Sequence, residues 1–135
     1  AGDTFFTYKL KGMYDFFKEN NTDCICATEI DNINDLKRMA VAVVNKDNIV
    51  TELQEKPQNP KSNLGVYATY IYKKETVKLF EKYINEKNNP DAPGHFVEWL
   101  YKHKDVKAYK FDGECYDIGT KESYNYVCDM MEVCL

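Results

Sequence analysis

The sequence reads MAVAVV over residues 39–44, NKDN over residues 45–48 and IVTELQ over residues 49–54. The two apolar stretches favour β-strands, and the asparagine and aspartate residues between them tolerate the left-handed backbone of a tight turn. Together the three stretches predict a β-hairpin. Because the strands of a hairpin are antiparallel, the sheet that contains them is predicted to be mixed rather than wholly parallel.

Helix and strand patterns alternate on both sides of this hairpin. The predicted elements are helices at 8–19, 75–84, 96–101 and 121–131, strands at 23–29, 64–72 and 106–111, and loops at 31–35 and 88–94. This alternation predicts an α/β fold with a mixed, mostly parallel sheet flanked by helices. The chain begins with a loop and a helix, so we expect the opening strands of the sheet to be missing.

Composition narrows the class of protein. The chain has 135 residues, enough for one domain, and its 44% hydrophobic and 30% charged residues are typical of a soluble globular protein. The net charge is −4 and no basic stripe is present, which disfavours nucleic acid as a partner. No apolar run reaches membrane-spanning length and no signal peptide opens the chain, so we expect no membrane association.

The five cysteines are odd in number and fit no zinc-binding spacing. They are Cys24, Cys26, Cys115, Cys128 and Cys134. We expect free, mostly buried thiols in a reducing cytoplasm.

Glu55-Lys56-Pro57 closes the second hairpin strand and is followed by a polar loop over residues 58–63. A glutamate can accept hydrogen bonds from sugar hydroxyls, and a lysine can meet a phosphate as a point charge. A solvated turn with a surface ion pair explains the same residues without a function.

Two further motifs carry carboxylates. Gly2-Asp3 opens the chain, where a glycine lets the backbone turn close to a ligand. Tyr116-Asp117-Ile118-Gly119-Thr120 places a carboxylate at the end of a strand. For Asp117 a turn or capping role is the structural alternative, and Thr120 reads mainly as a helix cap.

Taken in order, the three motifs resemble those of the sugar-1-phosphate nucleotidylyltransferases, the NDP-sugar pyrophosphorylases. The resemblance implies that Asp3 and Asp117 are the ligands of a catalytic Mg²⁺ ion. It implies that Glu55 binds sugar hydroxyls, that the catalytic Lys56 binds the sugar phosphate, and that Tyr70 lies near the sugar. The implied substrates are a nucleoside triphosphate and a sugar-1-phosphate, and the implied fold is that of the nucleotide-diphospho-sugar transferases.

The chain departs from the family pattern in several places. Thr4 stands where most members have asparagine, Ala68 stands where many have glycine, and a glycine is missing from residues 38–40. The family's glycine-rich loop ending in Thr-Arg-Leu, which holds the nucleotide, has no counterpart here. We therefore expect residues 1–135 to be a single partial domain, the C-terminal, sugar-phosphate-binding part of the catalytic domain.

The implied reaction is attack by the sugar-1-phosphate oxygen on the α-phosphorus of the triphosphate. We expect the isolated chain to be inactive, and to form homo-oligomers through an exposed sheet edge. A catalytically silent sugar-phosphate-binding or regulatory module of the same fold is the alternative. A related glycosyltransferase is a second alternative, but the sequence lacks the paired-aspartate motif that is usual in that class.

Overall fold

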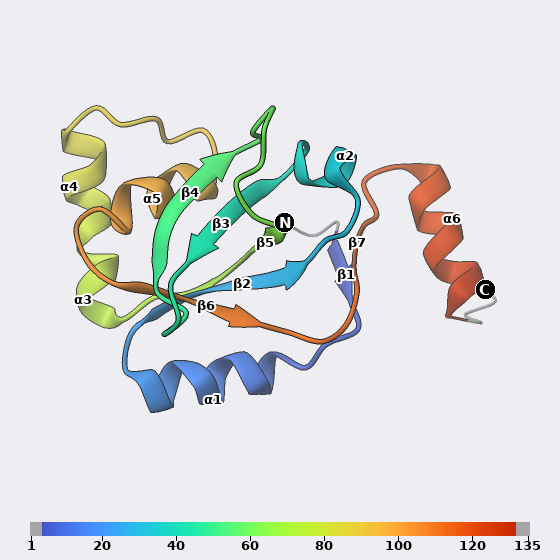
Figure 1. Cartoon of the computed structure of the whole chain (residues 1–135), viewed down its shortest axis with the longest axis horizontal. Coiled ribbons are helices and arrows are strands. Elements are labelled where there is room, and N and C mark those ends of the chain that lie inside the picture. The colour runs from blue at the N-terminus through green and yellow to red at the C-terminus, as the bar shows by residue number, and fades with distance from the viewer. Residues whose placement is uncertain (1–3, 132–135) are drawn as a thin grey trace. The chain divides into compact units, whose positions relative to one another are not determined.

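The computed structural model describes residues 4–131 and divides the chain into two compact units. The larger unit comprises residues 10–111, and the smaller unit is formed by the segments on either side of it. Each unit has its own sheet, of five strands in the larger unit and two in the smaller (Figure 1).

The larger unit alternates helices and strands along the chain. Its elements are α1 (Leu10–Asn20), β2 (Asp23–Glu29), α2 (Ile33–Leu36), β3 (Ala40–Val44), β4 (Val50–Glu55), β5 (Leu64–Ile71), α3 (Lys74–Val77), α4 (Leu79–Asn85), α5 (Pro93–Leu100) and β6 (Val106–Lys110). The α/β class with a mixed sheet is confirmed, and so is the hairpin, which β3 and β4 form.

The five strands lie in the order β4-β3-β5-β2-β6. Only the β2–β6 pair is parallel, whereas β2–β5, β3–β4 and β3–β5 are antiparallel. The expectation of a mostly parallel sheet is therefore wrong for the described strands. For the β3–β4 pair the physical reason is the short turn that joins the two strands, because a parallel pair needs a long crossover.

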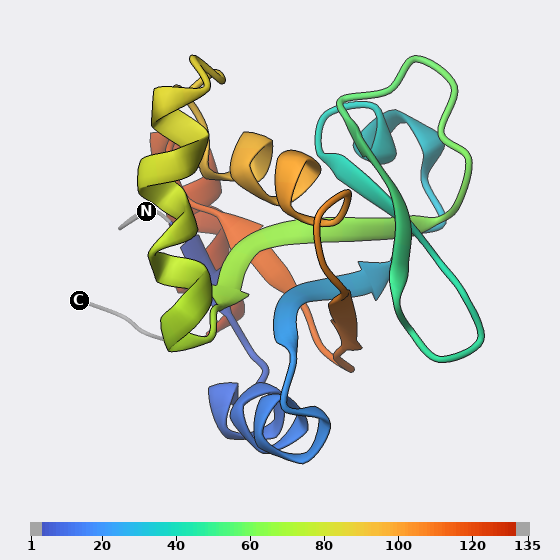
Figure 2. The same ribbon diagram turned by 90° about the vertical axis from the view of Figure 1, so that its left-hand side faces the viewer.

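Helices cover both faces of the sheet (Figures 1 and 2). On β6, Ala108 belongs to the core that also includes Phe96, Val97 and Leu100 of α5. The next residue, Tyr109, points to the opposite face because side chains alternate along a strand, and its ring lies 5.5 Å from that of Phe16 in α1. Strand β2, between the two layers, is accordingly buried over residues 23–27.

The turn of the hairpin reaches across to β6. Ala108 N donates a hydrogen bond of 2.9 Å to Asn48 O, and Ile49 and Lys107 form an isolated β-bridge. Asn48 has a φ of 60°, in the left-handed region that its side chain tolerates. The hairpin turn therefore covers part of the outer edge of β6.

A buried ion-pair cluster joins β2 to α3 and to the segment before β6. Asp23 is fully buried, and its Oδ1 accepts a hydrogen bond of 2.6 Å from Lys73 N. Its Oδ2 lies 2.8 Å from both Thr76 Oγ1 and Lys104 Nζ. Lys104 Nζ also donates to Thr76 Oγ1 at 2.6 Å. We call Asp23, Thr76 and Lys104 the Asp23 cluster.

Two helical segments differ from the sequence-based expectation. Residues 31–35 were expected to be a loop, but Ile33–Leu36 form α2, because the side chain of Asn32 accepts from Asn34 N and caps it. The helix expected at 75–84 is interrupted at Lys78, between α3 and α4.

The smaller unit contains β1 (Thr4–Phe6), β7 (Cys115–Asp117) and α6 (Lys121–Met130). β1 and β7 pair antiparallel, so the expectation of no strand before the first helix is wrong. Thr120 caps α6 as expected: its side chain accepts from Ser123 N, and Ser123 Oγ accepts from Thr120 N.

Among the described cysteines, Cys24 and Cys128 are free thiols, and Cys24 and Cys26 are buried whereas Cys115 and Cys128 are half-buried. Within residues 4–131, no helix combines the length and the apolar character that a membrane crossing requires.

Candidate functional site

The candidate site of the larger unit is built around Glu55. This residue ends β4, opposite Ala40 of β3, so its position is fixed by the hairpin register. The side chain is half-buried. Within residues 4–131 the Glu55 carboxylate has neither a hydrogen bond nor an ion pair. A half-buried carboxylate without a partner is poorly compensated for its lost hydration, which makes it available to a ligand.

The first turn of α5 brings Glu55 and Tyr70 together. A Cβ atom added at Gly94, the second residue of α5, would lie 3.3 Å from Glu55 Oε2 and 3.9 Å from the Tyr70 hydroxyl. Both groups therefore face the same backbone position. Tyr70 comes from β5, where it pairs with Ile25, so three separate elements meet at this point.

The electrostatic environment of Tyr70 reflects this arrangement. Burial, and secondarily the negative charge of Glu55, raise the pKa of Tyr70 to about 12. The phenol is consequently protonated at neutral pH and can donate a hydrogen bond to a ligand. Its ring stacks on that of Tyr72 at a centroid distance of 5.9 Å, which fixes its orientation.

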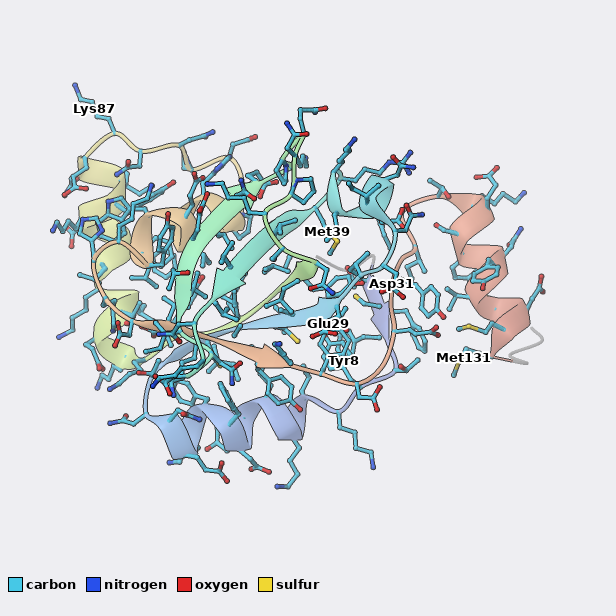
Figure 3. All side chains as sticks on the ribbon, in the orientation of Figure 1. Tyr8, Glu29, Asp31, Met39, Lys87 and Met131 are labelled. Atoms are coloured by element: carbon cyan, nitrogen blue, oxygen red, sulfur yellow. The ribbon has the colours of Figure 1, made fainter. Side chains whose placement is uncertain are left out.

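Lys56 follows Glu55 in an uncommon backbone conformation. Its φ is 44°, a left-handed value that costs a non-glycine residue about 1 kcal/mol or more. Lys56 N donates a hydrogen bond of 3.2 Å to the carbonyl oxygen of Met39, which is labelled in Figure 3. The hydrogen bond holds the turn in place, and the exposed Lys56 ammonium forms no ion pair with any described residue.

The polar loop after Pro57 is tied back to the hairpin. Lys61 Nζ lies 2.6 Å from Glu52 Oε1, and Lys61 N donates to Gln54 Oε1 at 3.0 Å. Ser62 Oγ donates to Ala42 O at 2.5 Å. Lys61 is thus engaged in structure, whereas Lys56 has no ion pair with a described residue and is available to a phosphate.

Asp117 lies in the smaller unit. It ends β7, opposite Thr4 of β1, and its carboxylate is exposed. Asp117 Oδ1 accepts a hydrogen bond of 3.0 Å from Gly119 N, which forms the turn before α6. Asp3, the other expected metal ligand, lies outside the described residues.

No three His, Cys, Asp or Glu side chains gather around a possible ion position within residues 4–131. Of the other residues expected at the site, Glu55 and Tyr70 are brought together, and Lys56 follows Glu55 in the chain.

Sequence reasoning missed Gly94. Its signal was the Pro93-Gly94 pair at a helix start, because a proline there fits the first turn while a glycine weakens a helix. It also missed a pocket of about 260 Å³ beside α4 and α5, which is lined by Tyr83, Asn88, Asn89, His95, Glu98, Trp99 and Lys102. Its charged groups pair internally in part, since His95 Nδ1 lies 3.6 Å from Glu98 Oε2.

Comparison with known proteins shows the family to which the chain belongs. The model of the family described as nucleotidyl transferase matches residues 1–132. The chain belongs to the nucleotidyl transferase family. The resemblance of the three motifs to sugar-1-phosphate nucleotidylyltransferases is thereby confirmed at the level of the family.

Two relatives of this nucleotidyl transferase chain are glucose-1-phosphate adenylyltransferases. That of Lachnospira eligens is 31% identical over 125 residues, covering 92% of the chain and 30% of the relative. That of Acetivibrio thermocellus is 32% identical over 127 residues, again with 92% and 30% covered. The chain thus spans less than a third of the length of these curated relatives.

The fold is shared with a solved structure of UDP-glucose pyrophosphorylase complexed with UDP-glucose. The TM-score is 0.78 at 20% sequence identity, and the alignment covers 97% of this nucleotidyl transferase chain and 54% of the other. The α/β fold expected from the motifs is confirmed by this likeness.

Proposed function

We propose that the chain is the sugar-phosphate-binding part of the catalytic domain of a cytoplasmic sugar-1-phosphate nucleotidylyltransferase. One observation carries the proposal: Glu55 and Tyr70 face the same point at the start of α5, with the Lys56 ammonium next in the chain. A carboxylate, a protonated phenol and an ammonium together suit a ligand that carries hydroxyl groups and a phosphate. Membership of the family supports the assignment.

In the proposed site the Glu55 carboxylate accepts hydrogen bonds from sugar hydroxyls, and Lys56 holds the phosphate. An oxygen of that phosphate attacks the α-phosphorus of the nucleoside triphosphate. A new P–O bond forms, the bond to the β-phosphate breaks, and pyrophosphate leaves with the bonding electron pair. Because the nucleophile belongs to the substrate, the chain's residues need only orient it and balance its charge.

The Asp117 carboxylate fits a role as a Mg²⁺ ligand. It is exposed, and among the contacts of residues 4–131 only Oδ1 is engaged, by Gly119 N, which leaves Oδ2 open to a hard cation. Asp3 would be the second protein ligand. A bound Mg²⁺ ion would supply positive charge to the phosphates.

Binding to the 135-residue chain tests the sugar-phosphate side directly. We expect glucose 1-phosphate to bind the chain in calorimetric titration, and Lys56→Ala to weaken binding by about 10-fold, because a charge-assisted contact is lost. Lys46→Ala, at the exposed hairpin turn, is the matched control and should bind like the unaltered chain. If the unaltered chain does not bind glucose 1-phosphate at millimolar concentration, the proposal is wrong.

The nucleotidyl-transfer step requires a separate assay. We expect no pyrophosphate release from the 135-residue chain, and Mg²⁺-dependent release when the N-terminal segment of the Lachnospira eligens relative precedes it. Asp117→Asn should abolish that release while keeping the hydrogen bond from Gly119 N. Release by the 135-residue chain alone would contradict its role as a part of the site. Sugar-phosphate binding without release in the fusion would favour a silent binding module.

Self-association through a sheet edge is part of the same proposal. β4 and β6 are the edge strands of the larger unit, and Asn48 and Ile49 cover part of β6. We expect light scattering to detect dimers or larger species. A monodisperse monomer would contradict the proposed self-association.

A further inference from the structure

We propose that Gly94 is a specificity-determining position: its missing side chain leaves the room in which the Glu55 carboxylate and the Tyr70 hydroxyl together receive a sugar hydroxyl. This inference rests on the proposed function, because it concerns how the same site selects its sugar. None of the three sequence motifs includes Gly94.

The geometry singles out Glu55 as the group that a larger residue would displace. A Cβ at position 94 would lie 3.3 Å from Glu55 Oε2, closer than an ordinary van der Waals contact, but 3.9 Å from the Tyr70 hydroxyl, which is ordinary. An alanine would therefore require the Glu55 carboxylate to shift by a few tenths of an ångström, while the tyrosine could stay in place. The two groups would no longer face a ligand at the original spacing.

The backbone at Gly94 does not itself require glycine. Among the described glycines the left-handed φ belongs to Gly113, whereas Gly94 lies in the first turn of α5 after Pro93. In a helix, alanine is favoured over glycine. The glycine thus opposes local stability, and the space that it leaves beside Glu55 supplies a reason for its presence.

The chemistry of the two facing groups defines the ligand class. The carboxylate is an acceptor, and it lies beside the N-terminal turn of α5. The Tyr70 phenol supplies a donor, since it remains protonated at neutral pH. Neighbouring free hydroxyls of a sugar match this pair, because one can donate to Glu55 while another accepts from Tyr70. A bulky N-acyl substituent at that position would need more space beside the carboxylate than a hydroxyl needs.

The test combines binding with stability. We expect Gly94→Ala to weaken glucose 1-phosphate binding about 10-fold while the melting temperature stays the same or rises. Glu55→Asp shortens the acid by one methylene, so adding it to Gly94→Ala should restore part of the lost affinity. His95→Ala, at the next residue and beside Glu98, is the matched control and should keep normal affinity. N-acetylglucosamine 1-phosphate should bind the unaltered chain more weakly than glucose 1-phosphate.

The outcomes separate the two proposals. If the unaltered chain binds glucose 1-phosphate and Gly94→Ala binds it equally well, the inference is wrong while the proposed function stands. Loss of affinity together with a lowered melting temperature, or without any recovery by Glu55→Asp, would show a structural effect of the substitution and also overturn the inference. If the unaltered chain does not bind the sugar phosphate, the proposed function fails and the inference falls with it.

Discussion

Asp23 and Glu55 are two carboxylates at strand ends of the same five-stranded sheet, and their surroundings are opposite. Asp23 begins β2, is fully buried and has partners on both oxygens, from Lys73 N, Thr76 and Lys104. Glu55 ends β4, is half-buried and has no partner within residues 4–131. Both oxygens of the Asp23 carboxylate are thus occupied by partners from the fold, whereas the Glu55 carboxylate is available to a ligand.

The difference separates a structural acid from a candidate ligand-binding acid. Removing one member of a buried, paired set leaves its partners buried without a hydrogen bond or counter-charge, which lowers the free energy of unfolding strongly. Removing an unpaired acid leaves no such partner behind. Stability measurements should therefore respond to the Asp23 cluster, and ligand binding should respond to Glu55. The following variants probe that division in order of decreasing effect on stability.

Asp23→Ala should produce the largest loss of stability. The substitution leaves the Lys104 ammonium, the Thr76 hydroxyl and Lys73 N without their shared acceptor, and we expect a loss of about 3 kcal/mol in the free energy of unfolding. Urea unfolding followed by circular dichroism measures it. Asp15→Ala, which breaks the exposed Lys11–Asp15 ion pair, is the control and should change stability little. Similar losses for Asp23→Ala and Asp15→Ala would show that the Asp23 cluster stabilises the fold no more than an exposed ion pair does.

The chain should lose stability at alkaline pH through Tyr70. Its pKa is about 12 in the folded chain and near 10 when unfolded, so the folded state holds the proton more tightly. This contribution, roughly 2 to 3 kcal/mol, is fully present below pH 10 and is lost as pH rises from 10 to 12. Tyr70→Phe should flatten the decline of stability over that range. An unchanged pH profile for Tyr70→Phe would refute the raised pKa.

Thr76→Val should cost about 1 to 2 kcal/mol. The side chain keeps its shape, but the hydrogen bonds of the hydroxyl to Asp23 Oδ2 and from Lys104 Nζ are lost. Differential unfolding in urea against the unaltered chain gives the value. A loss below a few tenths of a kcal/mol would mean that the Thr76 hydroxyl contributes little to the stability of the Asp23 cluster.

Glu55→Gln should have the smallest effect on stability, within about 0.5 kcal/mol, because the carboxylate has no described partner. The same variant should bind glucose 1-phosphate about 10-fold more weakly, since the neutral amide loses the charge-assisted hydrogen bond. Calorimetric titration and urea unfolding of one preparation measure both effects. A marked loss of stability with unchanged binding would reverse the comparison between Glu55 and Asp23.

Much of this fold could be predicted from local sequence patterns, because whether a segment forms a helix or a strand depends largely on residues that are close in sequence. The strand at 23–29 and the hairpin of β3 and β4 were found from apolar runs bounded by turn residues. The pairing of strands depends on contacts between distant segments, and for that reason the antiparallel β2–β5 pair and the β1–β7 pair were missed. The short helix α2 was missed because its asparagines and aspartates also favour turns.

The candidate site was predicted to a similar degree. Glu55 and Lys56 stand in one recognisable triplet, and Tyr70 was carried over from the family resemblance. Gly94 escaped notice because the absence of a side chain acquires meaning only beside the Glu55 and Tyr70 side chains, which come from other strands. The partners of Asp23 were equally hidden, since Thr76 and Lys104 are far from it in sequence.

The parallel pairing of β2 with β6 has a consequence for synthesis on the ribosome. β2 ends at Glu29, but its partner begins only at Val106. At a bacterial or eukaryotic elongation rate, roughly 4 to 16 seconds pass between their appearances. Throughout that interval the edge of β2 that β6 will cover, with its two cysteines and Ile25, has no partner from its own chain. A nascent chain of this design would be a natural client of chaperones that shield apolar strand edges.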